Sequence, residues 1–97
     1  MNLAVVFRPE AERDLAEARR WYEARSGGLG EQFVGAVAAT ISRIAENPQV
    51  FPAVLGETRR AVLNRFPYAI YFRPSIEQVV ILAVHSRQDP ARWQSRA

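Results

Sequence analysis

The stretch QVVILAV, residues 78–84, decides the fold, because every position after its glutamine is apolar. A strand with one face in water alternates apolar and polar residues, whereas this run is apolar on both faces. Such a run predicts a central strand, covered on both sides over part of its length. The strand leads directly into HSRQDPARW, residues 85–93, which contains the only histidine of the chain.

Alternation along this strand predicts which side chains share a surface. It places one set of residues on one face (Val79, Ile81, Ala83, His85 and Arg87) and the other set on the opposite face (Val80, Leu82, Val84 and Ser86). His85 and Arg87 are therefore expected to be neighbours. The alternation leaves open whether their face is covered by helices or open.

Two further β-rich runs come before the central one. They read TRRAVLN at residues 58–64 and YAIYF at residues 68–72. The segments between the runs are short enough for hairpin turns, so three antiparallel strands are expected. The preceding segment PQVFPAVLGE, residues 48–57, holds two prolines and a glycine and predicts a crossing loop anchored by Phe51.

The N-terminal half begins with a short β-rich run, NLAVVF, at residues 2–7. Pro9 then opens a helix whose first turn is crowded with acidic residues, including Asp14, where the helix dipole favours anions. Its apolar residues form one stripe along the helix (Ala11, Leu15, Ala18 and Tyr22). Trp21 widens this stripe at its C-terminal end. The adjacent glycines in SGGLG, residues 26–30, end this helix.

A second helical stripe begins at Glu31 and ends at Asn47 and Pro48 (Phe33, Val37, Ile41 and Ile44). The predicted fold class is α+β, in the order βααβββ, as one domain over residues 1–97. A right-handed crossover from the first strand through the helical hairpin would put both helices on one face of a small, mainly antiparallel sheet.

Composition excludes several classes of site. Cysteine is absent and there is one histidine, which excludes disulfides, thiolate metal sites and His-rich zinc sites. The chain has neither a signal-peptide pattern nor a membrane-spanning stretch. We therefore expect a soluble, cytoplasmic protein with no metal and no cofactor.

Charge is distributed unevenly along the chain. All thirteen basic residues are arginine. Residues 56–97 contain seven arginines and three acidic residues, a net charge of +4, whereas residues 1–55 have a net charge of −1. The basic half predicts contact with a polyanion or an acidic protein, or else a solvated arginine rim.

Two longer motifs, taken together, resemble a known family. They are RRAVLNRFPYAIYF at residues 59–72 and ILAVHSRQDPARW at residues 81–93. With the βααβββ order, they resemble the RelE/ParE superfamily, the toxins of bacterial type II toxin-antitoxin modules. Gln88 stands where the family often has a second basic residue before Asp-Pro. The resemblance implies a toxin neutralised by an antitoxin whose C-terminal segment wraps it.

The two branches of this superfamily differ in mechanism. The RelE-like branch cuts messenger RNA in the ribosome, and the ParE-like branch poisons DNA gyrase. On the RelE-like pattern, Arg60 and Arg87 match basic positions, but Ala69 stands where an arginine would follow the turn tyrosine. Trp93 stands where the tail tyrosine would lie. The resemblance therefore favours the ParE-like branch, with gyrase as the expected target, and leans away from an enzyme.

An endoribonuclease remains the alternative, because RNA cleavage needs a proton acceptor and His85 is the one side chain suited to it near neutral pH. It would act with Arg60 and Arg87, since arginine stabilises charge but is a poor base. Against this, a lone histidine at a strand end is more often structural. Ser86 points to the face opposite His85, so no hydrolase triad is expected.

The resemblance also suggests contact residues. The antitoxin is expected to dock along the helical hairpin, at Leu15, Trp21 and Tyr22, and to add a strand or helix beside the sheet. Of these, Tyr22 lies on the apolar stripe and is expected in the core. The target is expected to meet the basic half, with or without direct nucleic-acid contact (Arg60, Arg65, Arg87 and Trp93). Trp93 has a structural alternative, an aromatic clamp that folds the tail over the core.

Overall fold

The computed structural model describes residues 2–86 and 93–96. Along the chain, the elements are β1 (Ala4–Phe7), α1 (Pro9–Arg25), α2 (Leu29–Glu46), the short 3₁₀ helix η1 (Pro48–Val50), β2 (Ala53–Leu55), β3 (Thr58–Val62), β4 (Tyr68–Pro74), β5 (Gln78–Ser86) and a final 3₁₀ turn, η2 (Gln94–Arg96). The predicted α+β class is confirmed, and so is the βααβββ order, with one additional strand, β2, after the helices.

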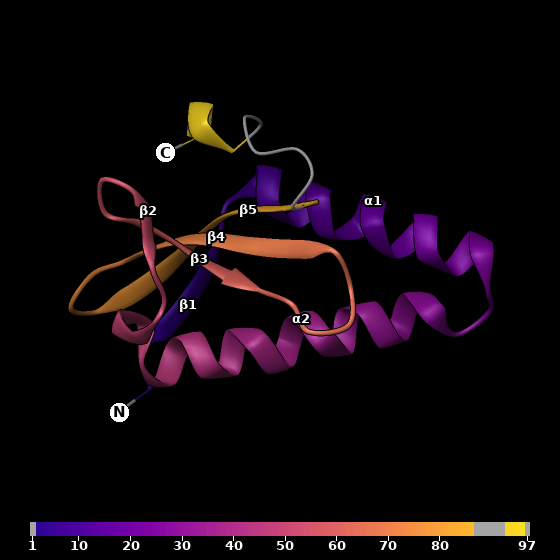
Figure 1. Cartoon of the computed structure of the whole chain (residues 1–97), viewed down its shortest axis with the longest axis horizontal. Helices are drawn as coiled ribbons and strands as arrows, with labels where there is room; N and C mark the ends of the chain where they lie inside the picture. The colour runs from indigo at the N-terminus through magenta and orange to yellow at the C-terminus, as the bar shows by residue number, and fades with distance from the viewer. Residues whose placement is uncertain (1, 87–92, 97) are drawn as a thin grey trace.

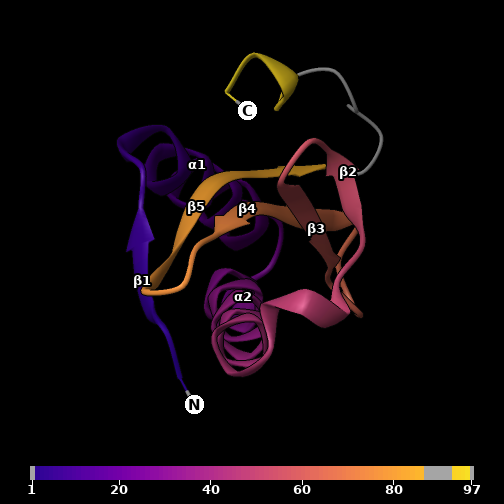
Figure 2. The same cartoon turned by 90° about the vertical axis from the view of Figure 1, so that its left-hand side faces the viewer.

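One five-stranded sheet organises the molecule, in the order β1-β5-β4-β3-β2. β1 runs parallel to β5, and the other neighbours are antiparallel. The two helices form a hairpin that packs against one face of the sheet, and the C-terminal η2 lies across the other face (Figures 1 and 2). The expected crossing loop over residues 48–57 contains an additional strand, β2, because residues 53–55 pair with β3.

The helical hairpin turns tightly because glycine permits a left-handed backbone and a close helix contact. Gly28 has φ 87° and precedes α2. A Cβ atom on Gly30 would lie 2.8 Å from the carbonyl oxygen of Arg19, so α1 and α2 approach each other at this point. Glu23 of α1 accepts hydrogen bonds from the backbone N–H groups of Gly28 and Gly30 and so caps α2.

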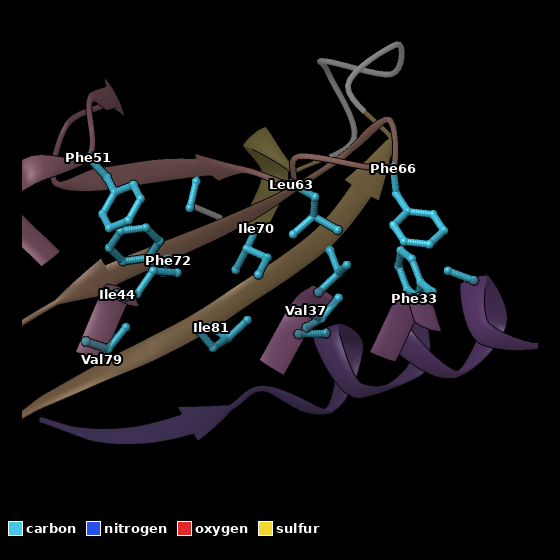
Figure 3. Packing of buried hydrophobic residues seen from close by; sticks show 14 of the residues in the cluster. Phe33, Val37, Ile44, Phe51, Leu63, Phe66, Ile70, Phe72, Val79 and Ile81 are labelled. Atoms are coloured by element: carbon cyan, nitrogen blue, oxygen red, sulfur yellow. The ribbon is translucent and has the colours of Figure 1, made fainter. Parts of the chain in front are cut away.

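The main core lies between the helices and the sheet (Figure 3). Phe33, Val37 and Ile44 of α2 pack against buried residues of β4 and β5. Tyr22 of α1 stacks on Phe33 at a centroid distance of 5.1 Å. Burial of this apolar surface provides the main driving force for the fold.

A β-bulge in β5 changes which of its side chains share a face. Tyr71 pairs with Ala83, but Phe72 pairs with Ile81, so Leu82 has no partner on β4. Val79, Ile81 and Val84 consequently all pack in the helix-side core. The expectation from strict alternation was therefore wrong beyond Ile81: Ala83 lies on the open face, away from Val79 and Ile81.

The open face is covered in part by the C-terminal tail. Trp93 stacks on Tyr71, with ring centroids 4.5 Å apart and an interplanar angle of 14°. It is only 5% exposed and forms a second, smaller cluster with Ala69 and Ala83. The predicted aromatic clamp is confirmed.

Candidate functional site

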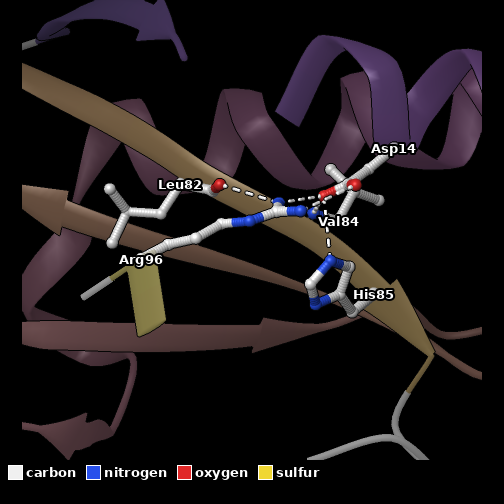
Figure 4. Close-up of polar contacts among 5 residues, drawn as sticks. All are labelled: Asp14, Leu82, Val84, His85 and Arg96. Carbon is white, nitrogen blue, oxygen red and sulfur yellow. Dashed lines mark hydrogen bonds and ion pairs between the residues drawn. The ribbon is translucent and has the colours of Figure 1, made fainter. Parts of the chain in front are cut away.

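A buried carboxylate, Asp14, joins three distant parts of the chain (Figure 4). It lies in α1 and is only 8% exposed. Its Oδ2 accepts the backbone N–H of Val84 at 3.0 Å and Nη1 of Arg96 at 2.6 Å. Nη1 of Arg96 also lies 3.4 Å from the carbonyl oxygen of Leu82. Asp14 thus ties helix α1, strand β5 and the tail together.

The position of Asp14 follows from the lengths of the strands. β1 ends at Phe7, which pairs with Ile81, and β5 continues to Ser86 without β1 beside it. The backbone groups of this edge need other partners, since unpaired buried polar groups are costly. The Asp14 carboxylate satisfies the N–H of Val84, and Arg96 donates to Leu82.

His85 lies beside this carboxylate and is only 2% exposed. Its Nε2 lies 3.1 Å from Oδ2 of Asp14, within ion-pair range. Neither ring nitrogen has a hydrogen-bond partner among the described residues, so the contact with Asp14 is a close ionic contact and not a regular hydrogen bond. In the sheet, His85 pairs with Ala69 and therefore belongs to the open face, next to Tyr71.

The surroundings of Asp14 keep it ionised. Burial alone raises the pKa of a carboxyl group, because it disfavours the charged form. Here the contact with His85 and the hydrogen bonds from Arg96 and Val84 outweigh burial and lower the pKa of Asp14 from 3.8 to about 2. Asp14 is therefore ionised at neutral pH, and the guanidinium of Arg96 balances its charge.

A hollow of about 180 Å³ opens beside the cluster, between α1 and the end of β5. We call it the α1–β5 hollow; it is lined by Asp14, Glu17, Ala18, Trp21, Tyr68, Val84, His85 and Ser86. His85 forms part of its wall, although its nitrogens are buried. A small polar group could enter the hollow, but the imidazole nitrogens are not open to solvent for proton exchange with a large substrate.

Arg60 and Arg65, two of the arginines proposed for the target, lie on other elements than this cluster. Arg60 is half-buried in β3, pairs with Tyr71 across the open face, and has a buried Nε with no hydrogen-bond partner among the described residues. Arg65 is exposed and donates to Gln32 of α2 at 3.0 Å. Arg87 lies outside the described residues. The structure therefore does not test the expected pairing of His85 with Arg87.

The residues proposed for the antitoxin differ in accessibility. Tyr22 is buried in the core, as its place on the stripe predicts. Trp21 is 49% exposed, and the guanidinium of Arg25 lies 3.5 Å from its ring centroid. Leu15 is half-buried and lines a second groove of about 580 Å³ with residues of β1, α1 and α2 (Phe7, Glu12, Ala16, Arg19 and Val34).

The importance of Asp14 and Arg96 was missed from the sequence. Asp14 was expected among the acidic residues of the first turn, but only Glu10 and Glu12 lie in that turn, and Asp14 is buried further along the helix. A signal for this was present, because residue 14 follows Ala11 by three positions and precedes Ala18 by four. It therefore lies on the apolar stripe itself. No comparable signal marked Arg96 among the other arginines.

Metal ligation and membrane insertion find no support in the described residues. They contain no group of three or more His, Cys, Asp or Glu side chains placed to hold a metal ion. In the same part of the chain, no helix is both long and apolar enough to cross a membrane.

Comparison with known proteins connects this fold to toxin-antitoxin modules. The family model described as the ParE toxin of the type II toxin-antitoxin system parDE matches residues 5–90. A solved chromosomal ParDE toxin-antitoxin system from P. aeruginosa superposes with a TM-score of 0.77 at 17% identity, covering 87% of this chain and 95% of that one.

A second solved structure is the RelBE2 toxin-antitoxin complex from Mycobacterium tuberculosis. It has a TM-score of 0.63 at 20% identity and covers 90% of this chain and 100% of that one. At these identities the two structures establish a shared fold. A search of curated protein sequences finds no match.

Proposed function

Since the chain belongs to the ParE toxin family of type II toxin-antitoxin systems, we propose that it stops growth by binding and poisoning DNA gyrase. In this proposal it acts in the cytoplasm as a single toxin domain over residues 1–97. It makes a stable complex with gyrase on cleaved DNA and does not itself cut nucleic acid.

The main observation behind this proposal is that His85 is buried, which speaks against a ribonuclease. RNA cleavage through the 2′-hydroxyl needs an accessible base and a cation for the developing charge. His85 is 2% exposed and lies against Asp14, and its ring nitrogens are buried. Two further positions favour a binding protein. Ala69 lies buried in the sheet, and the ring of Trp93 is covered by its stack on Tyr71.

The test measures both activities on one preparation of toxin. If the proposal holds, purified toxin blocks gyrase supercoiling and traps cleaved DNA, and it leaves messenger RNA intact with and without ribosomes. Unaffected gyrase at high toxin excess would refute the proposal. RNA cleavage would instead support the alternative, a ribonuclease that uses His85, Arg60 and Arg87.

His85→Gln separates these mechanisms, because glutamine removes the titrating group but keeps a polar side chain. We expect this variant to inhibit gyrase as the parent does, provided its circular dichroism spectrum and urea midpoint show that it is folded. A folded His85→Gln variant that has lost toxicity would favour the ribonuclease.

Both solved neighbours are toxin-antitoxin systems, which supports a cognate antitoxin as partner. We propose that the C-terminal segment of the antitoxin docks along the helical hairpin. There it would contact Leu15 in the apolar groove and the exposed Trp21 near the end of α1. Gyrase would contact the basic second half of the chain, residues 56–97. Arg65 is exposed there and Arg60 half-buried, while Trp93 would act by holding the tail in place.

A further inference from the structure

The C-terminal segment at residues 93–96, which we call the strap, lies on the open face of the sheet (Figure 2). Two side chains anchor it there. Trp93 stacks on Tyr71 with ring centroids 4.5 Å apart, and Arg96 donates to the carboxylate of Asp14 at 2.6 Å. The backbone N–H of Arg96 donates to the carbonyl oxygen of Trp93 at 2.9 Å, so both anchors belong to one turn. The two anchors are therefore expected to form and break together.

The strap covers Tyr71 on the side of the sheet away from the helices. Tyr71 is only 1% exposed and lies in the smaller cluster with Ala69 and Ala83. Its strand, β4, does not depend on the strap for its position. It pairs with β3 and β5, and its Ile70 and Phe72 are buried in the helix-side core. Release of the strap would uncover Tyr71 and leave that core in place.

Arg60 provides a second observation on the same face. It pairs with Tyr71 across β3 and β4, so the two side chains are neighbours. Its Nε is buried and has no hydrogen-bond partner among the described residues. A buried donor without a partner costs stability, because it has lost its water and gained nothing in return. The closed strap thus combines two stabilising anchors with an unsatisfied donor beside them, which lowers the free energy needed to open it.

We propose that the strap is an autoinhibitory contact. It opens from the sheet while the rest of the fold stays intact, and the open form presents Tyr71 and Arg60 together to the target. An aromatic ring beside a guanidinium group is a common anchor in protein interfaces. This inference rests on the proposed function, in which Arg60 contacts gyrase. There Trp93 holds the tail in place, and this hold is what restrains the toxin.

The first experiment nitrates the tyrosines of the free toxin with tetranitromethane and measures the rate at each site by peptide mass spectrometry. Tyr71 lies under the strap and Tyr22 in the helix-side core, so together they separate opening of the strap from unfolding of the chain. Arg96→Gln removes a charged donor and should speed nitration of Tyr71 by about tenfold or more. Trp93→Phe keeps a ring and should speed it by about two- to tenfold. Both variants should leave the rate at Tyr22 unchanged.

Gly30→Ala is the matched control, since it strains the helical hairpin and leaves both anchors of the strap intact. It should speed nitration of Tyr22, which becomes accessible when the helices separate from the sheet, and leave Tyr71 close to the rate of the parent. If Arg96→Gln and Trp93→Phe instead sped nitration of Tyr71 and Tyr22 by the same factor, the strap would open only with the whole fold, and the proposal would be wrong.

The second experiment asks whether opening controls the contact with the target. The apparent affinity of a protein falls with the fraction of its molecules in the binding form. Arg96→Gln should therefore inhibit gyrase at a lower concentration than the parent, by up to the factor by which nitration of Tyr71 rises. Unchanged or weaker inhibition by a folded Arg96→Gln toxin with faster Tyr71 nitration would overturn the autoinhibitory role.

The two experiments also separate this inference from the proposed function. Nitration is measured on the free toxin, without gyrase. A parent toxin that had no effect on gyrase would count against the proposed function, and the nitration rates of Tyr71 and Tyr22 would still decide whether the strap opens by itself.

Discussion

Arg96 donates from Nη1 to the carboxylate of Asp14 at 2.6 Å, across 82 positions of the chain. The pair fastens the C-terminal tail to the first helix. It also closes the edge of β5 beyond Ile81, where β1 is no longer present. Helix, central strand and tail are thereby held by one partly buried network.

Loss of the Asp14 carboxylate is expected to destabilise the fold strongly. Asp14→Asn leaves Arg96 without its anion and keeps only one acceptor oxygen for the N–H groups of Val84 and Arg96. Removing one partner of a buried ion pair costs about 3 kcal/mol. Urea denaturation should show this as a lower midpoint.

The exposed pair between Arg19 and Glu31 provides the control for this prediction. Arg19→Gln breaks a charge pair in the solvent and should leave the urea midpoint nearly unchanged. If Asp14→Asn and Arg19→Gln have the same small effect, the network around Asp14 does not hold the tail and strand together.

Stability should fall in acid because of Asp14. Its pKa is lowered from 3.8 to about 2 in the fold, so the unfolded chain binds the proton more readily. The stabilisation is complete above pH 3.8 and is lost as the pH falls through 2. The difference in pKa corresponds to about 2 kcal/mol. Urea midpoints between pH 6 and pH 2 should fall more for the parent than for Asp14→Asn, and parallel curves would contradict the assignment.

The helices and most strands were predictable because local patterns set them. Pro9 and the apolar stripe set α1, and the glycines after it set the turn. The run at residues 78–84 identified the central strand. Strand β2 escaped prediction because its pairing with β3 is tertiary. In addition, Pro48 at the start of η1 and Pro52 directly before β2 gave the segment the pattern of a loop.

The candidate site was predictable only in part. His85 was identified, but alternation could not foresee the bulge at Leu82, which changes the facing of the strand after it. Asp14 and Arg96 meet only because the tail folds back over the sheet. Such a long-range ion pair produces no periodic pattern in the sequence, so nothing distinguished Arg96 from the other twelve arginines.

Trp93 should contribute to stability through its stack on Tyr71. Trp93→Ala removes a buried ring and leaves the apolar surface of Ala69 and Ala83 uncovered. We expect a loss of about 3 kcal/mol, and a smaller loss for Trp93→Phe, which keeps an aromatic ring. Urea denaturation followed by circular dichroism measures both.

Trp21 provides the matched control for Trp93, since it is the other tryptophan and is half exposed. Trp21→Ala should lower the urea midpoint much less than Trp93→Ala. The reverse order would mean that the tail does not clamp the sheet in solution.

Two glycines of the same helix should respond in opposite ways to alanine. At Gly30, a Cβ would lie 2.8 Å from the backbone oxygen of Arg19 and 2.9 Å from the carboxylate of Glu23, so α1 and α2 must separate. We expect Gly30→Ala to destabilise the protein by about 1–3 kcal/mol, as overpacking does. At the exposed Gly35, a Cβ meets nothing within 4 Å. Gly35→Ala should therefore stabilise by up to about 1 kcal/mol, through helix propensity.

Thermal and urea unfolding of the two single variants measure this contrast directly. Gly35 lies inside α2, where alanine gains helix propensity, whereas Gly30 lies in the first turn, where this gain is smaller but has the same sign. A net loss of stability in Gly30→Ala therefore reports the contact between the helices. If Gly30→Ala were as stable as Gly35→Ala, the hairpin would have room at Gly30, and the close approach of α1 and α2 would not be a constraint on the fold.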